Sequence, residues 1–162
     1  MSKKVVAFLL IVYTVFSVGS CGKDYRKVLE GRGIPFTREA FLKEVGAGNK
    51  ENVVLFLKAG MDVNAVDKEG STALMIAAEK GDIELARVLL QNGADVNARN
   101  RDGYTALMYA AYKGSAEVVE LLLENNADVN ARDKDGWTAL RYAVLQGRND
   151  IVKLLAKAKE RK

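Results

Sequence analysis

The chain has 162 residues, of which 49% are hydrophobic and 28% are charged; this is ordinary for a globular protein and excludes disorder of the whole chain. A single cysteine excludes an internal disulfide, and the lack of histidine excludes Ser/His/Asp and Cys/His catalytic arrangements. The net charge of +4 falls toward neutral once the N-terminal Lys3 and Lys4 are removed, which argues against nucleic-acid binding.

The first 20 residues differ in composition from the rest of the chain. Lys3 and Lys4 precede an apolar run from Val5 to Val18, and the small residues Gly19 and Ser20 follow it, which is the pattern of an export signal. The run is shorter than the roughly 20 residues that a spanning helix needs, so a transmembrane helix is the weaker interpretation. We therefore predict a signal peptide over residues 1–20.

Cys21 directly follows this segment. The sequence Val18-Gly19-Ser20-Cys21 resembles the lipobox of bacterial lipoproteins, in which the cysteine receives diacylglycerol before cleavage and its new N-terminus is acylated. The resemblance implies lipidation of Cys21 and a location in the bacterial cell envelope, anchored to a membrane and facing the periplasm or the cell surface. The alternatives are an ordinary signal peptide with a free thiol, an uncleaved anchor and a buried first helix.

Residues 21–36 are predicted to be the lipid-bearing cysteine and a flexible tether. This segment is charged and contains two glycines close to the only proline of the chain. Fully extended, a tether of this length reaches about 50 Å. Phe36 and Phe41 flank Thr37 as a hydrophobic staple flanks an N-cap, so the first helix of the following domain is expected to begin after Thr37.

Residues 37–162 are predicted to form one domain of repeats with a period of 33 residues. The stretch Gly70–Asp102 recurs almost unchanged as Gly103–Asp135, and more divergent copies lie on both sides. A fixed period of this length indicates a stacked array. The four units are residues 37–69, 70–102, 103–135 and 136–162.

Each unit carries the signals of two short helices and a turn. In the second unit, Thr72 is placed to cap a first helix that Gly81 ends, and Asp82 is placed to cap a second helix that Gly93 ends. Asn126 replaces this last glycine in the third unit and also tolerates the left-handed conformation. The rest of each unit is a polar turn rich in Asn, Asp and Gly. The predicted fold is an all-α solenoid of four helix-turn-helix units, joined by polar β-turn or hairpin segments.

The repeats resemble the ankyrin family, whose Thr-Pro-Leu-His-x-Ala motif matches TALMIA, TALMYA and TALRYA. The Leu-Leu pair and the GADVNA segment also match, over about three quarters of the chain. Alanine replaces the motif proline and costs little, because alanine is the best helix former. The motif histidine is lost in every unit, which removes its hydrogen bond to the threonine. The departures are Ala73, Ala106 and Ala139 for proline, and Met75, Met108 and Arg141 for histidine.

The two end units are predicted to be polar caps, as a stacked array requires for solubility. Asn52 occupies the position that holds Leu85, Val118 and Ile151 in the later units, and Ala156 occupies that of Leu90 and Leu123. We therefore expect an array that needs no further unit and is a monomer. The basic C-terminal end is interpreted as a solvated helix; contact with anionic lipid headgroups is the alternative.

No motif indicates catalysis, a cofactor or a metal site. The segment Asp133-Lys134-Asp135-Gly136 superficially resembles a calcium-binding loop, but Ala131 and Tyr142 would occupy its first and twelfth positions. A polar turn that ends in glycine explains the same residues. The protein is therefore predicted not to be an enzyme and to bind no metal or cofactor.

Resemblance to ankyrin arrays implies that a partner binds the concave face, formed by turn tips and first helices. Tyr104 and Trp137 are expected to be neighbours there, because units stack about 8–10 Å apart, and Tyr, Trp and Arg dominate interface energetics. The alternative is that both rings only cover an adjacent turn, while Tyr109 and Tyr142 belong to the core. The candidate binding residues are Lys68, Ser71, Arg99, Arg101, Tyr104, Tyr112, Lys113, Arg132, Lys134 and Trp137.

The sequence therefore predicts a lipid-anchored, non-catalytic envelope protein that binds another protein with an acidic and partly apolar epitope. One alternative is an inhibitor or immunity-type protein that occludes an enzyme. Another is a structural envelope component that contacts peptidoglycan or lipid headgroups through its basic end.

Overall fold

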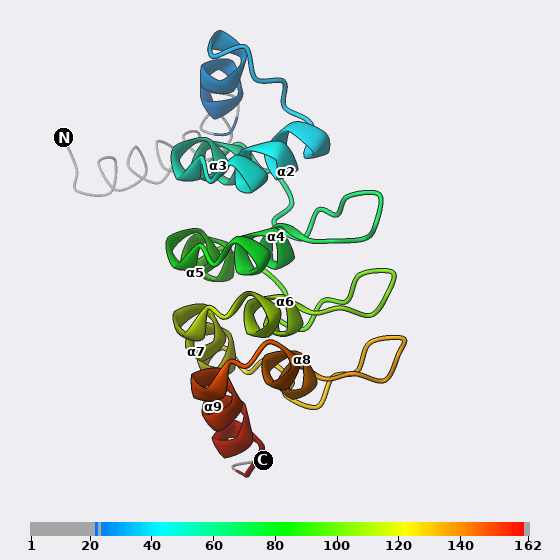
Figure 1. Cartoon of the computed structure of the whole chain (residues 1–162). Coiled ribbons are helices and arrows are strands. Elements are labelled where there is room, and N and C mark those ends of the chain that lie inside the picture. The colour runs from blue at the N-terminus through cyan, green and yellow to red at the C-terminus, as the bar shows by residue number, and fades with distance from the viewer. Residues whose placement is uncertain (1–21, 23, 161–162) are drawn as a thin grey trace, which may run out of the picture.

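The computed structural model describes residue 22 and residues 24–160. Among these residues, helices α2 to α9 form four successive pairs that stack along one axis (Figure 1). The first helices of the pairs lie in one layer and the second helices in another, and the connecting hairpins project to one side. This confirms the predicted all-α solenoid. The pairs are α2 (Arg38–Ala47) with α3 (Lys50–Lys58), α4 (Ala73–Lys80) with α5 (Ile83–Gln91), α6 (Ala106–Lys113) with α7 (Ala116–Glu124), and α8 (Ala139–Leu145) with α9 (Asn149–Glu160).

The helices begin and end where the caps predict. The hydroxyl of Thr72 accepts the backbone N–H of Met75 at 3.3 Å, and the equivalent threonines of α6 and α8 make the same contact. Gly81 ends α4 with φ of 72°. Asn126 has φ of 65° and is the only residue other than glycine with positive φ in the described part of the chain. It takes the left-handed conformation that Gly93 takes one unit earlier, as predicted.

The hairpins between units are held by one polar side chain each. Asp133 Oδ1 accepts the backbone N–H groups of Asp135 and Trp137 at 2.9 and 2.8 Å, and Asp67 and Asn100 accept the equivalent pairs. Backbone bonds also join successive hairpins. The aspartate-rich loop is therefore a polar turn, in agreement with the sequence interpretation. The part of the chain that the structure describes contains no cluster of three or more potential metal-binding His, Cys, Asp or Glu residues.

Three phenylalanine rings pack together at the first unit. The Phe56 ring of α3 is fully buried and lies 5.6 Å from Phe36 and 5.7 Å from Phe41 between ring centroids. Thr37 caps α2 by accepting the N–H of Ala40 at 3.1 Å, as expected. The phenylalanines on either side of this cap thus both pack on α3, which fixes where the first helix pair begins.

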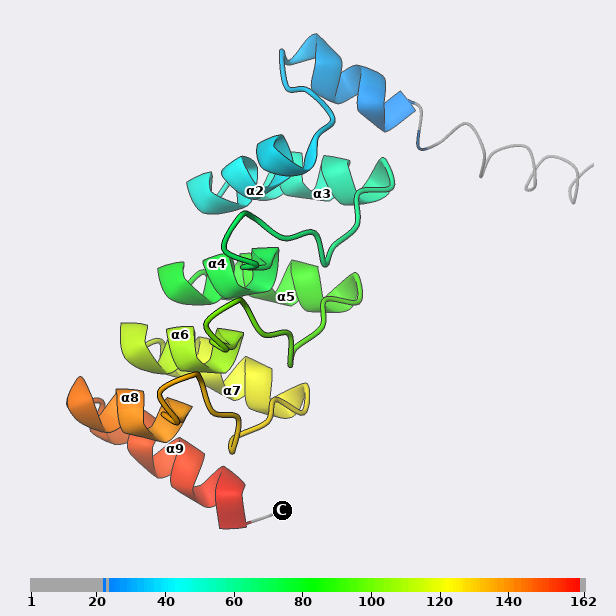
Figure 2. The same cartoon turned by 90° about the vertical axis from the view of Figure 1, so that its right-hand side faces the viewer.

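The segment before α2 is not a flexible tether, and that prediction is wrong. Residues 24–31 form a helix that packs across the N-terminal end of the stack (Figure 2). Its Leu29 is fully buried, and the Arg26 Nε donates to the Ala59 carbonyl at 3.3 Å. The two glycines and the proline mark only the end of this helix and the turn that follows it. They do not make the whole segment a flexible tether. Cys21 and the predicted signal peptide lie outside the described residues.

This added helix also changes the role of the first unit. Asn52 was expected on an exposed polar face, but it is half-buried, and its Oδ1 accepts from Arg32 Nη1 at 2.5 Å. Its Nδ2 donates to Glu44 Oε2 at 2.7 Å. The hydrogen bond from Asn52 holds the pKa of Glu44 below its ordinary value. The polar residue is therefore present because a different element, and not solvent, covers this end of the stack.

The C-terminal end is only partly the polar cap that was predicted. Ala156 of α9 is exposed, as expected for an outer position. On α8, however, Val144 is 58% exposed and Leu145 is 56% exposed. The basic residues of α9 do not cover this first helix.

Among the described residues, no helix has both the length and the apolar content needed to cross a bilayer.

Candidate functional site

All ten candidate binding residues lie on the first helices or on the hairpins that lead into them. Ser71, Tyr104 and Trp137 are half-buried. The other seven are exposed, and they are Lys68, Arg99, Arg101, Tyr112, Lys113, Arg132 and Lys134.

Aromatic side chains gather on α6, α8 and the hairpins before them. We name Tyr104, Tyr109, Tyr112 and Tyr142 the tyrosine cluster. Ring centroids of Tyr104 lie 5.5 Å from Tyr109 and 5.8 Å from Tyr142, and Tyr112 meets Tyr142 edge-on at 6.3 Å. Tilted and edge-on contacts of this kind stabilise aromatic groups beyond the burial of their surface. The hydroxyl oxygens of Tyr104 and Tyr142 also lie within hydrogen-bond distance of each other, at 3.1 Å. The cluster therefore joins two repeat units through ring contacts and a hydrogen bond.

Tyr104 and Trp137 are connected through a third ring. Trp137 packs on Tyr142 at 5.4 Å between ring centroids, and Tyr104 packs on the same ring at 5.8 Å. The guanidinium of Arg141 lies 4.5 Å from the centroid of the Trp137 ring. The two rings thus have local packing partners, which favours the alternative that they mainly cover neighbouring structure. Tyr112 is the most open ring of the cluster, at 53% exposure.

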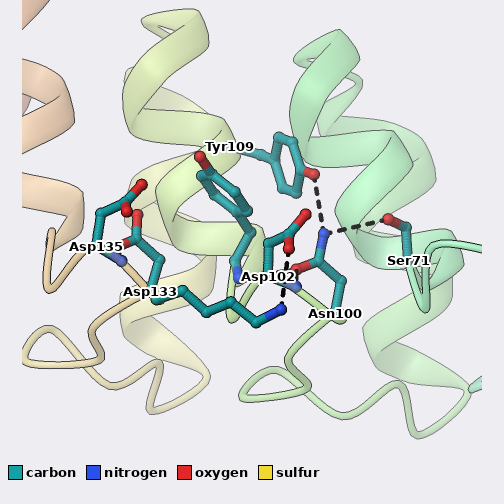
Figure 3. Close-up of polar contacts among 8 residues, drawn as sticks. Ser71, Asn100, Asp102, Tyr109, Asp133 and Asp135 are labelled. Carbon is teal, nitrogen blue, oxygen red and sulfur yellow. Dashed lines mark hydrogen bonds and ion pairs between the residues drawn. The ribbon is translucent and has the colours of Figure 1, made fainter.

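Two tyrosine hydroxyls bind the side chains that hold the hairpins. Asn100 Nδ2 donates to the Tyr109 hydroxyl at 3.2 Å and to Ser71 Oγ at 3.5 Å (Figure 3). One unit further, the Tyr142 hydroxyl donates to Asp133 Oδ2 at 2.5 Å. Both tyrosines stand at the variable position of the six-residue motif, where the second unit has isoleucine. Both tyrosines were predicted from the sequence to belong to the core, but their hydrogen bonds to the hairpin side chains were not predicted.

The ionisable groups of this network are held in their ordinary charge states at neutral pH. Burial would raise the pKa of Asp133, but hydrogen bonds from Tyr142 and the backbone outweigh it and lower that pKa. Burial is also the main reason why the pKa values of Tyr142 and Tyr109 are raised, and the bond to Asp133 adds to the effect at Tyr142. The hydroxyls therefore remain neutral. They can act as hydrogen-bond groups and not as bases.

The tyrosine cluster surrounds a hollow of about 290 Å³, which Met108 also lines. Met108 replaces the motif histidine, and at 1% exposure it forms the floor between the rings. Tyr109 and Tyr142 were predicted to be core and also line this hollow. The sequence did contain a signal for this placement, because each tyrosine directly follows the motif position held by Met108 or Arg141. The hollow offers apolar ring surface with hydroxyl groups around it, which suits a side chain of a partner protein.

Several of the predicted basic residues are engaged within the hairpins. Arg99 Nε donates to the Gly103 carbonyl at 3.4 Å, and its Nη2 donates to the Arg132 carbonyl. Arg132 Nη1 donates to the Gly136 carbonyl at 2.8 Å, while Lys134 pairs with Asp102 at 3.3 Å. These contacts stabilise the stacking of hairpins. Exposed surface pairs of this kind contribute little energy, so Lys134 remains available to a stronger partner.

Comparison with known proteins supports the interpretation of the repeats. A family model described as "Ankyrin repeats (3 copies)" matches residues 40–133 and 99–162, so the matches extend over most of the chain. A search of curated proteins finds no significant match. The motifs, the stacked helix pairs and the family match agree: the chain belongs to the ankyrin repeat family.

Proposed function

We propose that this protein is a non-catalytic scaffold that binds another protein through the tyrosine cluster and the hairpins beside it. Ankyrin repeats commonly bind proteins. The observation that carries the proposal is the hollow of about 290 Å³ with Tyr112 exposed at its edge. Tyrosine rings supply large contact surfaces at a small cost in side-chain entropy, which is why they are frequent in binding sites.

The expected partner presents an apolar side chain flanked by acidic groups. The hollow receives the apolar side chain, because rings and a methionine line it. The same layer of first helices and hairpins carries exposed basic side chains, among them Lys68, Arg101 and Lys113. Charges at the rim of an interface mainly raise the association rate and select the partner. We therefore expect binding that weakens as salt concentration rises.

A membrane anchor is the second part of the proposal. We infer that Cys21 is lipidated after export, because it follows an apolar run and two small residues. Because helix 24–31 docks on the first unit, no more than about 10 Å of chain separates Cys21 from Asp24. The array would then be held close to the membrane surface, in the periplasm or outside the cell, and would not move freely on a long tether.

Photocrosslinking in intact cells tests the binding surface. A photoreactive amino acid is introduced at Tyr112 of the full chain, and at Arg87, which is exposed on α5 in the other layer. We expect a discrete crosslinked protein from position 112 that is absent from position 87. Identical products from both positions, or none from position 112, would show that the tyrosine cluster is not the binding surface. If the captured partner is an enzyme, its activity in the complex tests for inhibition.

Metabolic labelling tests the anchor separately. Cells expressing the full chain are supplied with an alkyne-tagged fatty acid, and the Cys21→Ser variant serves as the control. We expect label on the parent chain and none on the variant, which should leave the membrane fraction. An unlabelled parent that retains Met1 in the membrane fraction would instead support an uncleaved anchor.

A further inference from the structure

The C-terminal end of the stack exposes residues that bind the next unit elsewhere in the array. Ala78 and Ala111 lie near the C-terminal ends of the first helices of the second and third units, and both are fully buried. Val144 occupies the same position in α8 and is 58% exposed. No helix pair follows α9 in the described part of the chain. An apolar stacking surface is therefore open at this end.

A second repeated contact is also open there. The carboxamide of Asn97 makes two hydrogen bonds to the backbone of the next unit. Its oxygen accepts from Asp128 N at 2.8 Å, and its nitrogen donates to the Asn126 carbonyl at 3.3 Å. Asn64 makes the equivalent pair of contacts one unit earlier. Asn130 is the next residue of this series, and its side chain makes no hydrogen bond to any residue that the structure describes. It remains free to bind a backbone from outside.

These residues line a hollow of about 560 Å³ at this end of the stack. Val129, Leu140, Val144, Leu145 and Leu155 form its apolar lining, and Asn130 lies beside them. The ionisable side chains that line it are all cationic, namely Arg132, Arg141 and Lys159. An occupant must therefore be apolar on one side and negatively charged at its borders.

A second copy of this chain fits this surface poorly. Head-to-tail stacking would require the N-terminal end of another copy, but helix 24–31 already covers that end with its buried Leu29. Tail-to-tail pairing would place the cationic residues of one copy opposite those of the other, because such an interface uses the same patch twice. Charge and coverage thus both favour a different, acidic partner.

We propose that the C-terminal end of the stack binds an acidic amphipathic helix of a partner protein. The apolar face of that helix packs on Val144, at the position that is buried in the earlier units, and on the adjacent exposed Leu145. Carboxylates at the borders of the helix meet Arg132, Arg141 and Lys159. This surface is separate from the tyrosine cluster, since Val144 and Leu145 line the C-terminal hollow while Tyr142 lines the other.

A synthetic helical peptide tests this directly. The peptide carries leucine along one face and glutamate at both borders, and a fluorescent label reports its binding to the purified full-length chain by anisotropy. One control peptide has the same composition in scrambled order, and another has lysine in place of glutamate. We expect saturable, salt-sensitive binding of the acidic helix, and binding weakened about tenfold or more for each control.

Variants of the protein locate the contact. Val144→Asp together with Leu145→Asp should weaken peptide binding about tenfold or more, because like charges then face the glutamates. Both residues are exposed, so the fold should tolerate the change, which circular dichroism checks. Val28→Asp is the matched control, since Val28 is 43% exposed at the opposite end of the stack. It should leave binding unchanged.

Three results would overturn the proposal. The first is an absence of saturable binding, and the second is equal binding by the parent and the Val144→Asp/Leu145→Asp variant. The third is a concentration-dependent dimer, seen by light scattering, that the same variant abolishes. That dimer would assign the surface to a second copy of this chain.

Discussion

At the N-terminal end of the array, helix 24–31 covers the first unit and buries Leu29 completely, whereas Val144 and Leu145 at the C-terminal end remain 58% and 56% exposed. The two ends face the same physical problem, because an outer unit lacks one of its two neighbours. Among the described residues, a substitute neighbour is present at the N-terminal end only. The N-terminal end is therefore closed by packing, while the C-terminal end leaves apolar side chains exposed, as the proposed docking of a partner helix requires.

The residues at the two ends also differ in polarity, and this difference matches the difference in covering. In the first unit, Asn52 stands where later units have fully buried leucine, valine or isoleucine, and it bonds to Arg32 of the covering segment. In the last unit, Val144 stands where the second and third units have alanine and the first unit has the fully buried Val45. The polar residue suits a neighbour that binds through a hydrogen bond. Val45 shows that a valine fits beneath a following unit, so Val144 is exposed because no helix pair follows it in the described part of the chain, and not because of its size.

The largest effect is expected from truncating the covering helix. Leu29→Ala removes a fully buried side chain and should lower the free energy of unfolding by about 2–5 kcal/mol. Val28→Ala, at a neighbouring position that is 43% exposed, should change it by less than about 0.5 kcal/mol. Urea unfolding followed by circular dichroism measures both. Similar small losses for the two variants would mean that the helix does not stay docked in solution.

A smaller effect should distinguish a covered stacking position from an open one. Ala111→Val inserts two methyl groups where the next unit packs, and should cost about 1–3 kcal/mol of unfolding free energy. The reverse exchange, Val144→Ala, should cost no more than about 0.5 kcal/mol, because that side chain is 58% exposed. The same urea experiment applies. A large loss from Val144→Ala would show that something already covers this end in solution.

The smallest effect concerns pH and the bond that ties α8 to its hairpin. Asp133 has its pKa lowered in the folded protein, so the folded state binds its proton less readily than the unfolded chain. Its contribution is therefore complete above the ordinary aspartate value of 3.8, and it is lost as pH falls from there through the lower folded value. Asp133→Asn should lower stability by about 1 kcal/mol at neutral pH.

The pH dependence is measured by urea unfolding between neutral and strongly acidic pH. Asn100 holds the preceding hairpin in the same way, so asparagine is a matched replacement. We expect the variant to lose less stability on acidification than the parent does. Tyr142→Phe removes the donor and should reduce the same acid-dependent loss. Parallel curves for all three proteins would exclude a special role for this carboxylate.

Features that recur with the repeat could be predicted from the sequence. The threonine caps, Gly81 and the left-handed Asn126 depend on local backbone preferences, which the sequence states directly. The aspartate-rich turn was also interpreted correctly, because its carboxylate binds N–H groups only two and four residues away. The candidate binding face was predicted from the family resemblance. Its hollow was not, because it depends on which rings meet across units.

The sequence alone thus determined the repeat, its helix boundaries and its turns. Each of these depends on contacts within one unit or on contacts that recur between successive units. Tertiary structure decided how the two ends of the array are covered. Whether residues 24–31 form a tether or a cover depends on the fit of Leu29 to the first unit, and no local pattern encodes that fit. The exposure of Val144 likewise depends on tertiary structure, because no helix pair packs on it among the described residues and the local sequence does not reveal this.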